Sequence, residues 1–199
     1  GAREAKPLRV FLQAGQSGCV GQADVSMMNN DPNYQDLQGV QDGVWFAGIK
    51  QGYYKSGTEP SHFYMGPMLA GEASKNNKAM GPEVAIGRRL YDADESGAPV
   101  LVVKYCWGGS NLKAEWNPNS PLNSWDKEAD DGTAEWLLEA DGGAELGNKK
   151  HLYGNLIYTV RRTLELLNDA DIPYVLSGMF WLQGAADKTR TWSEYGNDT

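Results

Sequence analysis

The stretch that decides the fold is PVLVVKY at residues 99–105, which lies between Gly97 and Gly108. It is rich in β-branched residues and is bounded by glycines, a pattern typical of a buried strand. Two other mostly apolar runs predict strands in the same way, LRVFLQA at 8–14 and YVLSGMFWL at 174–182. The chain therefore has three expected strands, far apart in the sequence.

Two segments with helical character lie between these strands. Gly81-Pro82-Glu83 begins the first, because proline suits a first helical turn and a carboxylate is favourable near a helix N-terminus. In the second, from about residue 149 to 168, leucine and valine recur at helical spacing. The alternation of strand and helix predicts a parallel sheet with right-handed crossovers, in which ligands bind beyond the carboxyl ends of the strands.

The composition limits the classes of function. The chain has 199 residues, which suggests one domain over residues 1–199, and 41% of them are hydrophobic. Its 18 Lys and Arg against 26 Asp and Glu give a net charge of −8, which argues against nucleic-acid and anionic-membrane partners. The apolar runs are too short to cross a bilayer. With two cysteines and two histidines, a metal site is not expected, nor is a cofactor.

Two long stretches, residues 16–80 and 111–148, show little periodicity and are predicted to be loops that build a site. Aromatic side chains are concentrated there. Their rings suit the faces of sugars, although loops of this length also need aromatic anchors in order to fold. The acidic cluster between residues 126 and 145 lacks the spacing of a calcium loop, so a solvated surface is expected. The aromatic residues are Trp45, Tyr53, Tyr54, Phe63, Tyr64, Trp116, Trp125 and Trp136.

Small polar residues follow each predicted strand. The three strand ends read QAGQS at 13–17, YCWGGS at 105–110 and WLQG at 181–184. Ser17 lies at a tight exit from its strand, where the hydroxyl would be exposed and neighbouring backbone N–H groups could stabilise an oxyanion. A Gly-Gln-Ser sequence is also common in ordinary turns, so this motif alone leaves a nucleophile and a simple turn both open.

Four blocks in order resemble the SGNH hydrolases of the sialic acid O-acetylesterase and acetylxylan esterase branch, which is carbohydrate esterase family 6-like. VFLQAGQSGCVG at 10–21 is similar to the family's Gly-Gln-Ser-Asn block, and MGPE at 80–83 to its Gly-Pro-Glu segment. KYCWGGSNL at 104–112, with Trp116, resembles its Gly-Gly-Thr/Ser turn, and FWLQGAAD at 180–187 its Trp-x-Gln-Gly-Glu-x-Asp block. The resemblance implies a three-layer α/β/α, flavodoxin-like SGNH hydrolase fold with a central parallel sheet.

The resemblance also implies a serine esterase that removes O-acetyl groups from carbohydrates, such as sialic acid or an acetylated polysaccharide like xylan. Ser17 would be the nucleophile. The backbone N–H of Ser17, the N–H of Gly109 or its neighbour Gly108, and the side-chain amide of Gln183 would form the oxyanion hole. The partner is then an acetylated carbohydrate substrate.

Two positions depart from the family's pattern, and one block is missing. Gly18 stands where the family has Asn, and Ala185 where it has Glu. The family takes its base from a late Asp-x-x-His block, which does not occur in these 199 residues, and neither His62 nor His151 is an evident substitute. The domain is therefore expected to be incomplete at the C-terminus, with the histidine and aspartate in the absent part.

The strand at 174–182 would be central in an intact sheet of this family but an edge here. An exposed apolar edge invites pairing with another chain. We therefore expect either the missing C-terminal half of the domain or self-association at that edge. Cys19 and Cys106 each follow a predicted strand, and they could form a disulfide or remain small buried side chains.

Two other classes of function stay open. A non-catalytic carbohydrate-binding domain on the same scaffold would explain Gly18, Ala185 and the missing base, and a purely structural fragment of a surface protein is a weaker option. The resemblance favours a secreted or periplasmic protein.

Overall fold

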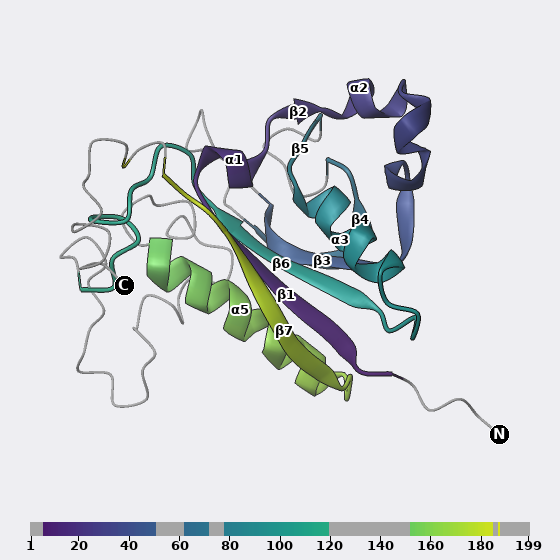
Figure 1. The fold of residues 1–199 in the computed structure, drawn as a ribbon. Coiled ribbons are helices and arrows are strands. Elements are labelled where there is room, and N and C mark those ends of the chain that lie inside the picture. The colour runs from purple at the N-terminus through teal and green to yellow at the C-terminus, as the bar shows by residue number, and fades with distance from the viewer. Residues whose placement is uncertain (1–5, 51–61, 72–77, 120–151, 185–186, 188–199) are drawn as a thin grey trace.

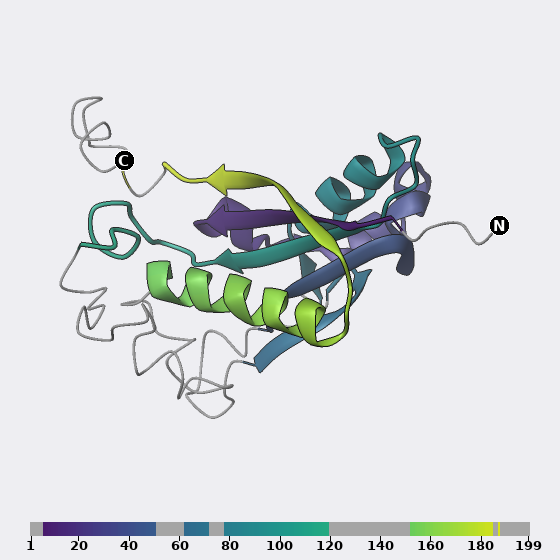
Figure 2. The same cartoon turned by 90° about the horizontal axis from the view of Figure 1, so that it is seen from below.

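The computed structural model describes residues 6–50, 62–71, 78–119, 152–184 and 187. Five strands form one sheet in the order β4-β3-β6-β1-β7. Strands β3, β6, β1 and β7 run parallel to one another, and β4 is antiparallel to β3 (Figure 2). The strands span Leu8–Gly15 (β1), Val40–Lys50 (β3), His62–Leu69 (β4), Val100–Cys106 (β6) and Tyr174–Leu182 (β7).

Two longer helices cover opposite faces of this sheet (Figure 1). Side chains along β6 alternate between the two sides: Val100 and Val102 pack in one cluster with Val84 of α3, whereas Leu101 and Val103 pack in another with Leu167 of α5. Every residue of β6 is buried, as expected of a strand covered on both faces. The helical elements are α1 (Ser17–Val20), α2 (Val25–Asn29), η1 (Pro32–Leu37), α3 (Glu83–Asp92) and α5 (Leu152–Asp169).

The predicted three-layer α/β/α architecture is confirmed, and so are the three predicted strands and two predicted helices. The prediction of a loop over residues 16–80 was wrong, because β3 and β4 lie within it and complete one side of the sheet. A small antiparallel pair, β2 (Ala23–Asp24) with β5 (Ala79–Met80), lies there too. Residues 120–148 of the second predicted loop, with its acidic cluster, lie outside the described residues.

The structure describes four of the aromatic residues singled out in these stretches, and most of them pack within the protein. Phe63 packs against the core, and the ring of Tyr64 stacks on Phe46 with centroids 6.2 Å apart. Trp116 is buried at 3% exposure, and Trp45 lies within β3. Three of these side chains therefore pack in or against the core, as anchors of their segments, whereas Trp45 is 43% exposed. The other four lie outside the described residues.

Strand β7 forms one edge of the sheet, as predicted. It pairs with β1 alone among the described strands. Several of its large apolar side chains are exposed, with Leu176 at 56% and Val175 at 50%. In Figure 2, β7 is the yellow-green strand on the outer side of β1.

Candidate active site

Three strands end side by side at one edge of the sheet. Gly15 at the end of β1 is in register with Cys106 of β6 on one side and with Leu182 of β7 on the other. Just beyond, the Trp107 N–H donates to the Gly15 carbonyl and the Gln16 N–H to the Leu182 carbonyl, both at 2.9 Å. The segments that follow the three strands therefore leave the sheet together, and these are the segments that the sequence singled out.

Ser17 begins the short helix α1 directly after β1. Gly15 has φ of +137°, and a Cβ there would lie 2.1 Å from the Leu182 carbonyl oxygen, so only glycine allows the chain to leave the sheet this close to β7. The Gln16 carbonyl then accepts two N–H groups of α1 at 2.8 and 3.0 Å. The result is a tight turn in which Ser17 is exposed.

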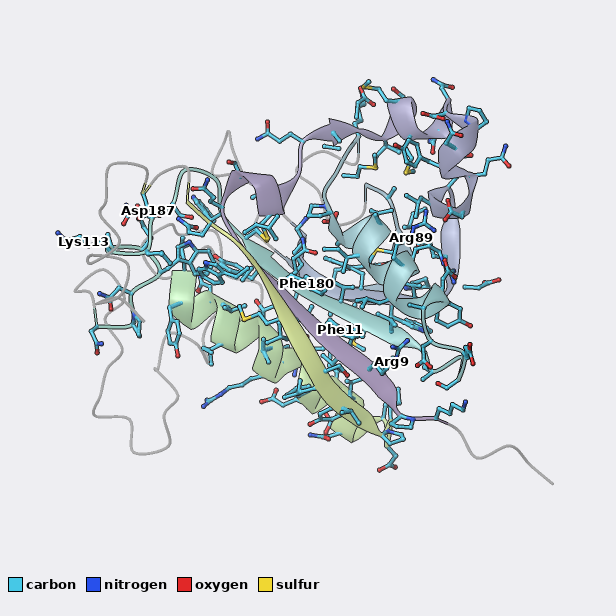
Figure 3. The ribbon with its side chains drawn as sticks, viewed as in Figure 1. Arg9, Phe11, Arg89, Lys113, Phe180 and Asp187 are labelled. Carbon is cyan, nitrogen blue, oxygen red and sulfur yellow. A yellow bond between two sulfur atoms is a disulfide. The ribbon has the colours of Figure 1, made fainter. Side chains whose placement is uncertain are left out.

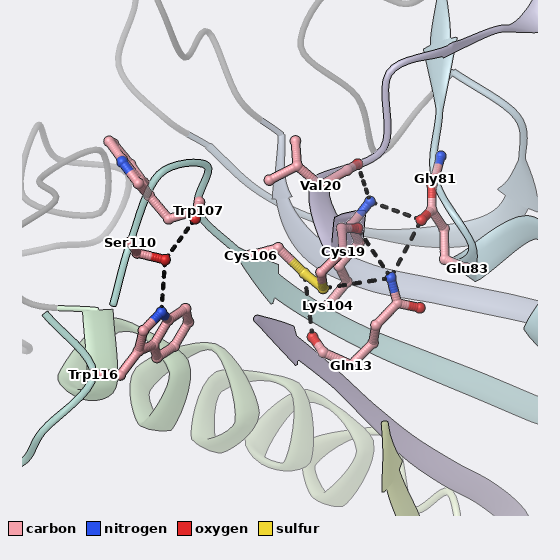
Figure 4. Close-up of a disulfide and its surroundings, with 10 residues drawn as sticks. All are labelled: Gln13, Cys19, Val20, Gly81, Glu83, Lys104, Cys106, Trp107, Ser110 and Trp116. Carbon is pink, nitrogen blue, oxygen red and sulfur yellow. Dashed lines mark hydrogen bonds and ion pairs between the residues drawn. A yellow bond between two sulfur atoms is a disulfide. The ribbon is translucent and has the colours of Figure 1, made fainter. Parts of the chain in front are cut away.

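A disulfide between Cys19 and Cys106 joins this turn to the end of β6, with a Cα–Cα distance of 5.7 Å (Figure 4). The sequence was compatible with either a disulfide or two free thiols, and the structure contains the disulfide. Both sulfur-bearing residues are buried. The segments proposed to carry the nucleophile and the glycine donor are thus covalently connected.

A buried ion pair lies under the same turn. The Lys104 Nζ is 2.7 Å from Glu83 Oε2, and the two side chains are only 5% and 1% exposed. Lys104 Nζ also donates to the Val20 carbonyl of α1 at 2.8 Å. The sequence predicts Lys104 in a strand and Glu83 at a helix N-terminus but does not connect the two. The lysine inside an otherwise apolar strand was the feature that could have revealed the ion pair, because a buried charge needs a partner of opposite charge.

The turn after β6 is held by a buried serine. Ser110 Oγ donates to the Trp107 carbonyl at 2.6 Å and accepts from Trp116 Nε1 at 2.7 Å. Gly109, the expected donor of a backbone N–H, precedes it and is exposed. Trp116 packs edge-to-face against Trp181 of β7, with ring centroids 4.9 Å apart, so this loop also contacts the third strand.

Gln183 connects the loop after β6 with the loop after β7. Its Nε2 donates to the Ser110 carbonyl at 2.9 Å and to Asp187 Oδ2 at 2.6 Å, while the other oxygen of Asp187 accepts the Leu112 N–H at 3.1 Å. Asp187 is buried and lies beside the loop that carries Lys113, beyond the end of the sheet (Figure 3). Both hydrogens of the Gln183 amide are thus engaged within the protein, so an oxyanion would have to displace one of these acceptors.

No histidine of the described residues lies at the ends of β1, β6 or β7. His62 lies at the start of β4, which is separated from β1 by β3 and β6, and His151 lies outside the described residues. Burial raises the pKa of the Tyr105 hydroxyl above its ordinary value, so this side chain, which accepts a hydrogen bond from Asn155, stays protonated. Among the described residues no cluster of three or more His, Cys, Asp or Glu is placed to hold a metal ion, and no helix is long and apolar enough to cross a membrane.

An apolar pocket of about 360 Å³ lies among β2, α2, η1, β5 and α3. Gly81 lines it, but Ser17, Gly109 and Gln183 do not. The backbones of Gly21 and Gly81 meet next to it, since a Cβ on Gly21 would lie 2.0 Å from the Gly81 Cα. The pocket is therefore a neighbour of the candidate site and not the site itself.

The chain matches the family model for a carbohydrate esterase, sialic acid-specific acetylesterase, over residues 7–198. A solved structure of a protein from Arabidopsis thaliana is 17% identical, with a TM-score of 0.53 over 97% of this chain and 65% of that one. The structure of NanS is 15% identical, with a TM-score of 0.51 over 98% of this chain and 61% of that one. At these identities the likeness concerns the fold.

A carbohydrate acetylesterase from Xanthomonas citri is 16% identical, with a TM-score of 0.47 over 96% of this chain and 35% of that one. The chain thus spans about two thirds or less of the length of each of these structures. None of the curated proteins matches it.

Proposed function

The chain belongs to the sialic acid-specific acetylesterase family of carbohydrate esterases, and from that premise we propose that the protein is a serine esterase that removes O-acetyl groups from carbohydrates. Sialic acid or an acetylated polysaccharide such as xylan is the proposed substrate. One observation carries the proposal: an exposed Ser17 follows a strand whose end is hydrogen-bonded to the ends of both neighbouring strands.

In the proposed reaction, Ser17 Oγ attacks the acetyl carbonyl carbon, and negative charge develops on the carbonyl oxygen. The N–H groups of Ser17 and Gly109 and the amide of Gln183 stabilise this charge, and loss of one such donor costs about 100-fold or more in rate. Collapse of the intermediate releases the sugar hydroxyl, which takes up a proton, and leaves an acetyl group on Ser17. Attack by water then releases acetate.

Gln183 has a double task in this scheme. It holds Ser110 and Asp187 in the resting protein and turns one N–H toward the oxyanion when substrate is bound. The carboxylate of Asp187 keeps its hydrogen bond from the Leu112 N–H in either state. The loops after β6 and β7 therefore stay connected when one hydrogen of the Gln183 amide is redirected.

A serine hydroxyl is a weak nucleophile at neutral pH unless a base takes its proton. The proposed base is a histidine of the Asp-x-x-His block, which the family's motif order places C-terminal to Asp187. The same C-terminal part is a proposed partner for the open edge of β7, with a second copy of the chain as the other. The Cys19–Cys106 disulfide supports a secreted or periplasmic location, because such bonds persist in oxidising compartments.

The test compares Ser17→Ala with the wild type in a protein that includes the histidine block. Hydrolysis of 4-nitrophenyl acetate and of an acetylated sugar should be lost. Ser26→Ala is the matched control, because Ser26 is also an exposed serine in the first turn of a short helix and should keep full activity. Unchanged turnover in Ser17→Ala rules the mechanism out.

A second candidate, a carbohydrate-binding domain without catalysis, is favoured by Gly18 and Ala185, which replace the usual Asn and Glu. It predicts that calorimetry detects binding of an acetylated sugar while no acetate is released. The presence of an Asp-x-x-His block downstream, together with release of acetate, would decide for the esterase.

A further inference from the structure

A buried polar cluster supports the turn that carries Ser17, and ester hydrolysis itself makes no use of it. The cluster consists of Gln13 on β1, Glu83 at the start of α3 and Lys104 on β6, none of which is more than 5% exposed (Figure 4). These three elements are distant in the sequence and converge under α1.

Lys104 supports the end of α1. The last carbonyl groups of a helix have no partner within it, and the negative end of the helix dipole favours a cation. Lys104 Nζ donates to the Val20 carbonyl, the last of α1, at 2.8 Å and to Glu83 Oε2 at 2.7 Å. The ammonium group thus satisfies α1 and is itself neutralised from α3.

Gln13 and Glu83 extend the support to the rest of the turn. Gln13 Nε2 lies 3.3 Å from the Cys19 carbonyl and 3.4 Å from Glu83 Oε2. The other oxygen of Glu83 accepts the Gly81 N–H at 2.9 Å. Two consecutive carbonyl groups of α1 are therefore held from below by side chains, and both side chains are coordinated by one carboxylate.

The backbone at Gly81 closes the cluster from the side. A Cβ at this position would lie 2.8 Å from the Val20 carbonyl oxygen, 2.9 Å from Lys104 Nζ and 2.4 Å from Glu83 Oε2. Real side chains essentially never approach so closely, so the cluster leaves no room for a methyl group. Any shift of α1 toward or away from α3 would break these contacts.

A buried ion pair is weak evidence for stability, because the cost of removing two charges from water offsets much of their attraction. Its hydrogen bonds are directional, however, and here they end on the carbonyl groups of α1. We infer that Lys104 and Glu83 are positioning residues that hold α1, and with it Ser17, in place relative to the turn of Gly109. This inference rests on the proposed esterase function for its consequence in catalysis.

The test uses the double variant Lys104→Met/Glu83→Gln, in which no buried charge is left unpaired and the oxygen of the introduced amide can still accept the Gly81 N–H. Three amides close the α1 turn, those of Cys19, Val20 and Gly21. Their hydrogen exchange, measured by NMR in the full chain, should become at least about 10-fold faster. In the longer protein that includes the histidine block, kcat for 4-nitrophenyl acetate should fall about 10- to 100-fold with little change in KM. This is the result expected when a reacting group is misplaced.

The control variant is Arg9→Met, which removes an ion pair of 3.1 Å with Asp94 near the start of β1, at the other end of the sheet. It should lower the melting temperature while leaving the exchange of the α1 amides and kcat unchanged. If the double variant does not fold, Lys104→Leu/Glu83→Gln takes its place, since it likewise leaves no buried charge unpaired, with the same expected changes.

Wild-type exchange at all three amides together with wild-type kcat in a folded variant overturns the inference. A loss of stability without faster local exchange also overturns it, because a merely structural pair would behave in that way. Faster exchange in a protein whose Ser17 proves not to be the nucleophile would reject the proposed function and keep the support of α1 by Lys104 and Glu83.

Discussion

Strands β6 and β7 flank β1 on its two sides, run parallel to it and end at the same site, yet they differ in almost every other respect. All seven residues of β6 are buried, and Val103 at its centre has no exposed surface. On β7 most residues are exposed, and Leu176 is 56% exposed. The comparison shows that one half of the site is built into the core and the other half is carried on an open edge.

The two strand ends are fixed by different chemistry. The β6 side holds α1 through a disulfide and through Lys104, both buried. On the β7 side the link runs through neutral and charged hydrogen bonds of Gln183 and Asp187. We therefore expect changes at the β6 side to reduce stability most, and changes along the β7 edge to act mainly on association.

Removing the disulfide should have the largest effect on stability. The double variant Cys19→Ala/Cys106→Ala is expected to lose about 2–5 kcal/mol of unfolding free energy, because the bond closes a long loop of the unfolded chain. Urea unfolding followed by tryptophan fluorescence measures the loss. Since the chain has only two cysteines, dithiothreitol should shift the wild-type midpoint and leave that of the variant unchanged. An equal response of both proteins to dithiothreitol would contradict the bond.

Asp187→Asn tests the hydrogen-bonded side of the site. Both carboxylate oxygens accept an N–H, but an asparagine amide has one acceptor oxygen, so one donor would face an NH₂ group. The expected loss is about 1–3 kcal/mol of unfolding free energy, typical of a broken hydrogen bond to a buried charge. Asp169→Asn, at an exposed residue near the end of α5, is the control and should change stability by less than about 0.5 kcal/mol. Equal effects of the two variants would mean that Asp187 does not join the loops.

The contrast between the strands also explains what the sequence could predict. The runs that become β1, β6 and β7 are continuous and mostly apolar, which is the pattern of parallel strands near the core. Strand β3 was missed because its apolar run, residues 44–49, is short, contains Gly48 and lies in a stretch rich in Gly, Asn, Asp and Tyr. In β4, Pro67 weakened the strand pattern, and the structure places this strand at the other edge of the sheet, where proline is tolerated.

At the site, the order of motifs predicted which segments meet, but not how they are held. Ser17 could be found because it directly follows a recognisable strand. The disulfide depends on a distance of 5.7 Å between Cα atoms, which no spacing in the chain encodes. The pairing of Lys104 with Glu83 depends in the same way on how α3 packs on β6. The two hydrogen bonds that Asp187 accepts, from Leu112 and Gln183, depend on the path of the loops after β6 and β7.

Tyr105 offers a smaller test of the buried side, through pH. Burial raises the pKa of its hydroxyl in the folded protein, whereas a tyrosine of the unfolded chain ionises at its ordinary pKa of about 10. Above that pH the unfolded chain binds fewer protons than the folded one, so stability should fall as pH rises. Tyr105→Phe should flatten this fall while losing about 1 kcal/mol at neutral pH, because Asn155 loses the hydroxyl as an acceptor.

Denaturant midpoints of the wild type and Tyr105→Phe between about pH 7 and 11, a range that brackets the ordinary tyrosine pKa, measure the effect. Tyr34→Phe is the control, because its side chain is 46% exposed and its replacement should leave the alkaline slope unchanged. Parallel slopes for the wild type and Tyr105→Phe would show that ionisation of Tyr105 does not limit stability at high pH.

Leu176→Lys on β7 should have the smallest effect on the stability of a single chain, within about 0.5 kcal/mol, because the side chain is already exposed. Its expected effect is on association. An unpaired apolar edge recruits another strand, and a lysine there discourages the contact. Sedimentation over a range of concentrations should show self-association of the wild-type chain and a monomer of 21.8 kDa for the variant. Val40→Lys, at a position 60% exposed on β3, should leave association as in the wild type. A wild-type chain that stays monomeric at every concentration would refute pairing between copies, leaving a C-terminal part of the domain as the proposed partner of β7.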